Sequence, residues 1–139
     1  MFAEKELSGV RIFAFSELSQ LPYFIFAVTS RQTDLDLGCG DETDESDRKK
    51  KLGATLGIDS TQLFTLRQVH SARTVVLKPL QEGALGPADG VIVTEPGLFA
   101  AVRTADCMPV VAVYPQGKQV ALFETAKAML RGIGLLRGD

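Results

Sequence analysis

Two side chains in this sequence have the chemistry and the setting of a catalytic or metal-binding pair. His70 is the only histidine, and it lies at the start of a half of the chain that is rich in predicted strands. Cys107 follows a strand predicted to end at Val102. A turn at the end of a strand exposes a thiol to a cleft, although an unpaired cysteine more often packs as a small buried hydrophobe. We therefore take His70 and Cys107 as the candidate site.

This pair allows more than one kind of chemistry. Imidazole and thiolate are both suitable ligands for zinc, and a catalytic zinc usually has three protein ligands and an open position. Without a metal, Cys107 can act as a nucleophile with His70 as its base. Copper-based oxidation is disfavoured, because copper oxidases need many histidine ligands and the chain supplies one. The residues alone leave the zinc and the nucleophile alternatives open.

Predicted strands and a helix must position these side chains. The apolar runs Val10–Phe15 and Tyr23–Val28 predict strands, and a polar loop follows over residues 29–43. Asp44 stands before an acidic stretch, which suits the entrance and first turn of a helix, and Gly57 is well placed to end that helix.

The second half of the chain predicts β structure. A turn at residues 115–117 makes a hairpin of its last two strands, and Pro109 is expected to stop the preceding turn before the first of them begins. Residues 124–130 favour a helix, residues 131–139 are rich in glycine, and residues 124–139 form a divergent tail. With 139 residues we expect one folding unit. The predicted strands are Val75–Leu77, Val91–Val93, Phe99–Val102, Val110–Tyr114 and Val120–Phe123.

Composition argues against several classes of protein. The 15 basic and 17 acidic residues nearly balance and form no basic patch with interleaved aromatics, so nucleic acid is not expected as a partner. The charge-free stretch Leu18–Ser30 is too short and too polar to span a bilayer. Charged residues 4–6 precede any apolar run, unlike a secretion signal. We therefore expect a cytoplasmic protein that does not enter membranes.

The motifs around His70 and Cys107 are specific in their order and spacing. They resemble those of the YfiH-like family, which is also described as a laccase-domain or multicopper polyphenol oxidoreductase family and as purine nucleoside phosphorylases with adenosine deaminase activity. The resemblance covers residues 24–123. It rests on Thr29-Ser30-Arg31, Leu35-Asp36-Leu37-Gly38, Gly40-Asp41-Glu42, Gln68-Val69-His70, Ala88-Asp89-Gly90, Thr94, Pro96-Gly97-Leu98, Thr104-Ala105-Asp106-Cys107 and Pro109.

This resemblance implies a fold and a set of metal ligands. The fold would be an α/β mixed-sheet sandwich with flanking helices, incomplete here at its C-terminal side. The family binds zinc through a His, a Cys and a second His, and the first two map onto His70 and Cys107. Glu124 stands where the second His of a His-Ala-Gly-Trp-Arg-Gly motif should be, and the following Trp and Arg are absent. Because a carboxylate can also bind zinc, a site of His70, Cys107 and Glu124 is expected.

The function implied by the resemblance is zinc-dependent purine nucleoside phosphorolysis with adenosine deamination. Zinc activates water, which can attack the amino-bearing carbon of adenosine, whereas phosphorolysis needs a cation to steady phosphate. Arg31 is the candidate for that cation, with a purine nucleoside and phosphate as partners. The alternatives are a Cys–His hydrolase, a copper polyphenol oxidase, and a degenerate inactive fragment. Such a fragment, from a truncated, frame-shifted or diverged gene, would self-associate through its unfinished sheet.

Overall fold

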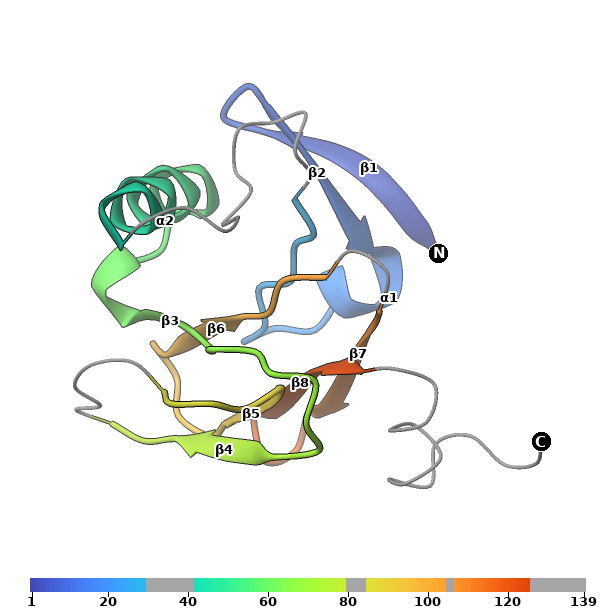
Figure 1. Cartoon of the computed structure of the whole chain (residues 1–139). Helices are drawn as coiled ribbons and strands as arrows, with labels where there is room; N and C mark the ends of the chain where they lie inside the picture. Colours follow the sequence, from blue (N-terminus) through green and yellow to red (C-terminus); the bar gives the residue numbers. More distant parts are fainter. Residues whose placement is uncertain (30–41, 80–84, 105–106, 126–139) are drawn as a thin grey trace. The chain divides into compact units, whose positions relative to one another are not determined.

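The computed structural model describes residues 1–29, 42–79, 85–104 and 107–125 (Figure 1). The chain divides into two compact units, Met1–Leu63 and Phe64–Asp139. The expectation of one folding unit stays a prediction. Of the divergent tail at residues 124–139, the structure describes Glu124 and Thr125, and the rest lies outside the described residues.

The N-terminal unit begins with an antiparallel hairpin of β1 (Phe2–Leu7) and β2 (Val10–Phe15). The turn residues Ser8 and Gly9 have φ values of 51° and 78°, a left-handed pair that matches the right-handed twist of hairpin strands. On β2, Ile12 and Ala14 are buried two residues apart, as alternation along a strand requires. The predicted strand Val10–Phe15 is confirmed, whereas β1 was not predicted because charges at residues 4–6 interrupt its apolar pattern.

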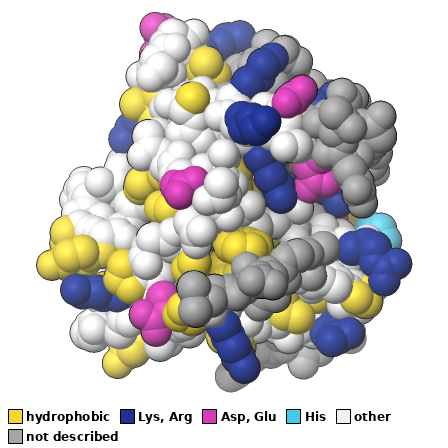
Figure 2. Space-filling model, turned by 90° about the vertical axis from the view of Figure 1, so that its left-hand side faces the viewer, with side chains coloured by type: hydrophobic (Ala, Val, Ile, Leu, Met, Phe, Trp, Pro, Cys, Tyr) yellow, Lys and Arg dark blue, Asp and Glu magenta, His cyan; other side chains and the backbone are white. Residues whose placement is uncertain are grey.

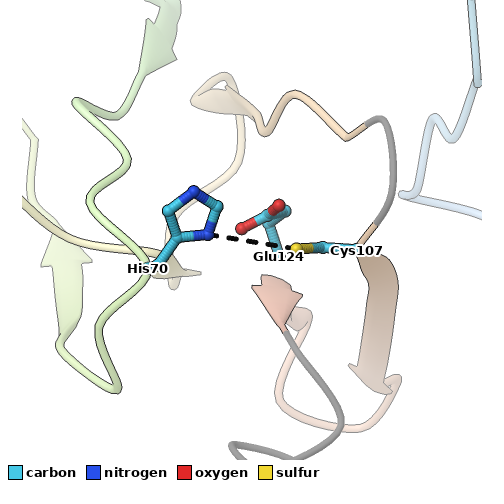
Figure 3. A group of neighbouring side chains, drawn as sticks. All are labelled: His70, Cys107 and Glu124. Atoms are coloured by element: carbon cyan, nitrogen blue, oxygen red, sulfur yellow. Dashed lines mark hydrogen bonds between the residues drawn. The ribbon is translucent and has the colours of Figure 1, made fainter.

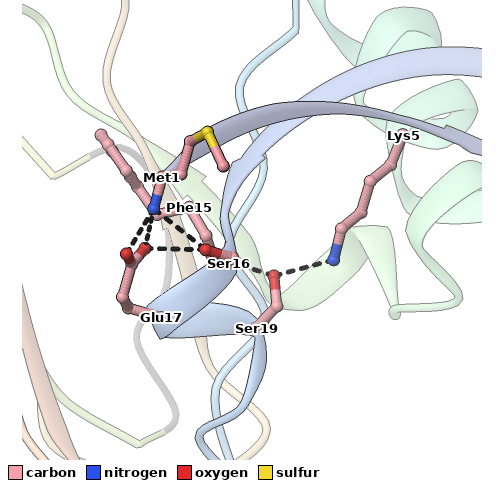
Figure 4. A network of polar contacts seen from close by, with 6 residues as sticks. All are labelled: Met1, Lys5, Phe15, Ser16, Glu17 and Ser19. Carbon is pink, nitrogen blue, oxygen red and sulfur yellow. Dashed lines mark hydrogen bonds and ion pairs between the residues drawn. The ribbon is translucent and has the colours of Figure 1, made fainter.

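A short helix, α1 (Ser16–Ser19), follows the hairpin and takes part in a polar network with the N-terminus (Figure 4). The Met1 ammonium donates to Ser16 Oγ at 2.9 Å and forms an ion pair with the Glu17 carboxylate. Lys5 Nζ donates to Ser19 Oγ at 3.0 Å. The hydrogen bond from the N-terminal ammonium, with help from the Glu17 and Ser16 donors, lowers the pKa of Glu17 from 4.5 to about 2.

The predicted strand Tyr23–Val28 is wrong. Only Val28 pairs with a strand, in an isolated bridge to Phe13 closed by two backbone hydrogen bonds of 2.9 and 2.8 Å. Two features explain the difference. Pro22 has no N–H to donate, and Tyr23 adopts a φ of 102°, so the chain enters this segment in a turn.

Helix α2 (Glu42–Leu56) confirms the predicted helix, and Gly57, with a φ of 70°, lies just beyond its end. The helix as described begins at Glu42, two residues before Asp44. After α2, the 3-10 turn η2 (Ser60–Gln62) is capped by Asp59, which accepts hydrogen bonds from Thr61 N at 2.9 Å and Thr61 Oγ1 at 2.7 Å.

The C-terminal unit is built on a mixed sheet with the strand order β4-β5-β8-β7. β4 runs parallel to β5, and the other two pairs are antiparallel. β3 pairs with β6 in a two-stranded sheet. This mixture of several sheets with few helices confirms the expected α/β class. The strands are β3 (Leu63–Thr65), β4 (Thr74–Leu77), β5 (Gly90–Val93), β6 (Phe99–Ala101), β7 (Met108–Tyr114) and β8 (Gln119–Thr125).

The predicted hairpin is confirmed by β7 and β8, with two corrections. Pro109 does not precede the strand but lies within it, opposite Glu124. A proline is tolerated there because β7 is the last strand in this sheet's order and need not donate on its outer side. Glu124 and Thr125 continue β8 and do not begin a helix, because they pair with β7 and Glu124 N donates to Asp89 O at 2.9 Å.

The core of the C-terminal unit lies against the β5 and β4 strands. Leu77 and Val91 are fully buried, and burying such side chains contributes about 1.5 to 3 kcal/mol each. Gly90 is required where β5 meets β8, since a Cβ there would lie 2.5 Å from the Phe123 ring. The core cluster comprises Leu66, Leu77, Leu85, Ala88, Val91 and Val93.

On the face shown in Figure 2, Lys and Arg side chains are interspersed with Asp and Glu, and hydrophobic side chains lie between them. This mixed surface agrees with the near balance of 15 basic and 17 acidic residues. Among the described residues, no helix has the length and apolar character needed to cross a membrane.

Candidate metal centre

The structure brings together the three side chains predicted as metal ligands (Figure 3). His70 comes from the loop that follows β3, Cys107 directly precedes β7, and Glu124 lies near the end of β8. One ligand atom from each residue lies within 4.8 Å of the other two. Cys107 Sγ is 3.9 Å from His70 Nδ1. Residues separated by up to 54 positions therefore meet at one point of the C-terminal unit.

The distance between Cys107 and His70 is close to that in a site for a small tetrahedral metal. With the usual zinc–sulfur and zinc–nitrogen bond lengths, a tetrahedral site separates Sγ from a ring nitrogen by about 3.6 Å. The observed separation of 3.9 Å is slightly larger, so a small side-chain movement would close the site around an ion. Nitrogen, thiolate and carboxylate are all accepted zinc ligands. The donor set thus suits zinc in its chemistry, and the Cys107–His70 pair lies near the spacing that a zinc site needs.

The three candidate ligands differ in burial. His70 is exposed and Cys107 is half-buried, whereas Glu124 is only 5% exposed. Among the described residues, Glu124 Oε2 is a buried side-chain oxygen with no hydrogen-bond partner. Such an atom is costly to bury, and an unseen ion or water is a common explanation. The Glu124 carboxylate therefore has an oxygen that is open to a metal ion or a water.

The His70 loop has an unusual backbone conformation that a buried carboxylate supports. His70 has a φ of 58°, in the left-handed region that costs a non-glycine residue roughly 1 to 3 kcal/mol. Asp89, 1% exposed, accepts from the backbone N–H groups of Val69, His70 and Ser71 at 2.8 to 3.3 Å. It also accepts from Ser71 Oγ at 2.9 Å.

These hydrogen bonds set the protonation of Asp89. Burial acts to raise its pKa, but donation from Ser71, Val69 and His70 outweighs burial and leaves the pKa below the ordinary value of 3.8. The Asp89 carboxylate is therefore charged at neutral pH and remains an acceptor for the loop.

A second link joins the His70 loop to the segment before Cys107. Gln68 Nε2 donates to Arg103 O at 2.7 Å, and Arg103 N donates to Gln68 Oε1 at 2.7 Å. Thr104 Oγ1 then donates to the backbone carbonyl of Cys107. The amide of Gln68 thus ties the backbone on the histidine side to the backbone on the cysteine side.

The sequence predicts the three candidate ligands but gives no role to the residues that hold them. Asp89 and Gln68 belong to motifs of the family resemblance, without a function of their own. Their positions in the sequence are the signal that could have indicated a role. Asp89 directly precedes the buried strand β5, and Gln68 lies two residues before His70. Arg31, the candidate for phosphate binding, lies outside the described residues.

The sequence matches the family described as multi-copper polyphenol oxidoreductase laccase over residues 18–125, which is more than half of the chain. The chain therefore belongs to this family. The resemblance to YfiH-like proteins is thereby confirmed, and a protein called YfiH from Bacillus licheniformis is among the similar solved structures.

Curated relatives carry names from purine metabolism. A purine nucleoside phosphorylase of Streptomyces coelicolor is 32% identical over 93 residues, which are 66% of this chain and 38% of that protein. An adenosine deaminase from an unknown prokaryotic organism is 34% identical over 84 residues, covering 55% of this chain and 32% of that protein. The chain thus spans less than two fifths of the length of these relatives.

Solved structures share the fold. The crystal structure of YlmD from Geobacillus stearothermophilus matches with a TM-score of 0.60 and 25% identity, over 66% of this chain and 38% of that one. A Neisseria meningitidis protein matches with a TM-score of 0.59 over 94% of this chain and 52% of that one. At 20% identity, the second likeness concerns the fold alone.

Proposed function

We propose that His70, Cys107 and Glu124 hold a zinc ion and that this centre acts on purine nucleosides, by phosphorolysis with phosphate or by deamination of adenosine. The observation that carries the proposal is that one ligand atom from each of the three residues lies within 4.8 Å of the other two. The buried Glu124 Oε2, which has no hydrogen-bond partner among the described residues, adds to it. The names of the two relatives support purine nucleosides as the substrate class.

Each side chain has a distinct part in this proposal. When bound, zinc supplies a Lewis acid that polarises the substrate and activates water near neutral pH. Cys107 binds as a thiolate and His70 through a neutral ring nitrogen. Glu124 adds a second negative charge where the motif implied by the family resemblance has a neutral histidine, so the ligands offset the metal charge more fully. We therefore expect weaker Lewis acidity and slower turnover than with a histidine at position 124.

The proposal also includes a residue for phosphate binding and a choice between zinc and copper. Arg31 is our candidate for the phosphate, because a guanidinium binds phosphate oxygens in a two-pronged geometry. Zinc is preferred over copper, since the chain has one histidine and the proposed donor set includes one sulfur and one carboxylate.

The test is to measure zinc and copper content of the purified chain together with adenosine and inosine turnover in phosphate. Cys107→Ala and Glu124→Gln should each lose zinc and activity, and Glu124→His should keep zinc and turn over faster. Glu95→Gln is the matched control, because Glu95 is exposed in the turn between β5 and β6. A wild-type chain that contains no zinc and is inert overturns the proposal and favours a degenerate fragment.

A second candidate uses Cys107 as a nucleophile and His70 as its base. The 3.9 Å separation of Sγ and Nδ1 is slightly long for a resting pair and short enough to tighten with substrate. This reaction would proceed in a chelator, and an electrophilic substrate analogue would modify Cys107. Activity abolished by the chelator and restored by zinc excludes it.

A further inference from the structure

Asp89 is not one of the three candidate ligands, but it forms several hydrogen bonds to the segments that carry them. Its carboxylate accepts from three consecutive backbone N–H groups, and the middle one belongs to the ligand His70. The hydroxyl of Ser71 adds a further hydrogen bond at 2.9 Å. Three successive N–H groups that converge on one anion, with a left-handed residue among them, form a concave backbone arrangement typical of anion binding.

The backbone of Asp89 forms two further hydrogen bonds next to the candidate centre. Its N–H donates to Arg73 O at 3.1 Å, at the far end of the His70 loop. Its carbonyl accepts from Glu124 N at 2.9 Å, so the same residue also contacts the strand that carries the third ligand. Asp89 is therefore bonded to two of the three elements that supply ligands.

We propose that Asp89 is a positioning residue that sets the His70 imidazole against Glu124 and Cys107. Without the carboxylate, the left-handed conformation of His70 loses the three backbone hydrogen bonds to Asp89, and the loop relaxes toward ordinary φ values. Because the ring is exposed, packing alone does not hold it in place. This inference rests on the proposed metal centre for its consequence, but the placement of the ring can be tested without metal.

The first measurement uses Co²⁺ as a probe, since it occupies tetrahedral sites and its thiolate and ligand-field absorption bands report geometry. Loss of a group that orients a metal ligand typically weakens metal binding about 10- to 100-fold. We expect Asp89→Asn to weaken Co²⁺ binding by a factor in that range. The new amide would place an N–H donor against the backbone N–H groups of the His70 loop. The absorption bands should shift, which reports an altered geometry and not merely fewer folded molecules.

Two control variants separate positioning from stability. Asp59→Asn makes the same chemical change at a carboxylate that also accepts from a backbone N–H and a hydroxyl, but in the N-terminal unit. Leu77→Ala destabilises the core of the C-terminal unit without altering a contact of the His70 loop that we describe. Both should keep the Co²⁺ spectrum of the wild type and its affinity per folded molecule.

The second measurement needs no metal. Magnetization transfer in NMR between the His70 ring and the Cys107 β-protons should be seen in the metal-free wild type, because Nδ1 and Sγ are 3.9 Å apart. It should disappear in Asp89→Asn and persist in both control variants. If Asp89→Asn does not fold, Ser71→Ala removes one donor to Asp89 and should weaken the same signal in part.

The outcomes distinguish the two proposals. A wild type that binds no Co²⁺, with a ring signal that depends on Asp89, overturns the metal centre and supports the positioning role. Variants at Asp89 and Ser71 that keep both the ring signal and the wild-type Co²⁺ spectrum overturn the positioning role and leave the metal centre standing.

Discussion

Carboxylates of the two units have opposite surroundings. In the N-terminal unit, Glu17 lies at the surface, where its ion pair with the Met1 ammonium competes with water. In the C-terminal unit, Asp89 and Glu124 are 1% and 5% exposed. Asp89 has four donors, whereas Glu124 Oε2 has no partner among the described residues. The difference teaches that burial alone does not define the role of a carboxylate, because Asp89 is surrounded by donors and Glu124 Oε2 is left open.

The largest effect expected from this comparison is that of Asp89→Ala. It leaves the N–H groups of Val69, His70 and Ser71 without their acceptor, and we expect the free energy of unfolding of the metal-free chain to fall by about 2 to 4 kcal/mol. Urea denaturation measures this. A loss below about 0.5 kcal/mol, the range of ordinary surface substitutions, would contradict the stabilising role.

Glu124→Leu is expected to stabilise the metal-free chain, whereas Asp89→Ala destabilises it. Replacing a buried carboxylate that lacks a partner by an apolar side chain should raise the free energy of unfolding of the metal-free chain by about 1 to 2 kcal/mol. Excess zinc should then stabilise the wild type and not the variant. Glu95→Leu, at an exposed position, is the control and should change stability little. A Glu124→Leu chain that is clearly less stable without metal would show that Glu124 has a structural partner.

The smallest effect belongs to Glu17. Its pKa is lowered from 4.5 to about 2 in the folded chain, so its contribution is fully present above pH 4.5 and is lost as the pH falls toward about 2. The stability difference between wild type and Glu17→Gln should therefore shrink across that window, and salt should reduce it. Acid titration of both chains, followed by circular dichroism, measures it, with an N-acetylated chain as the control. A difference that does not change with pH would exclude the ion pair.

Much of the C-terminal unit could be predicted from sequence, because its strands are apolar runs separated by Pro and Gly turns. The N-terminal unit was harder to predict. β1 carries charges on an exposed hairpin, and the apolar segment that begins at Tyr23 bonds to β2 only at Val28. His70 and Cys107 were recognisable as rare reactive residues. Glu124 was found only through its position in a motif, and the role of Asp89 could not be predicted, because three of its contacts are to backbone N–H groups.

The pairing of β7 with β8 also decides which side chain completes the site. Pro109 lies opposite Glu124, and the turn at residues 115–118 fixes that alignment. Successive residues of a strand point to opposite faces, so a one-residue slip would turn Glu124 away and present Phe123 or Thr125 instead. The length of a surface turn thus determines which side chain of β8 faces the candidate site. An insertion or deletion in that turn would change the site without altering any of the three proposed ligands.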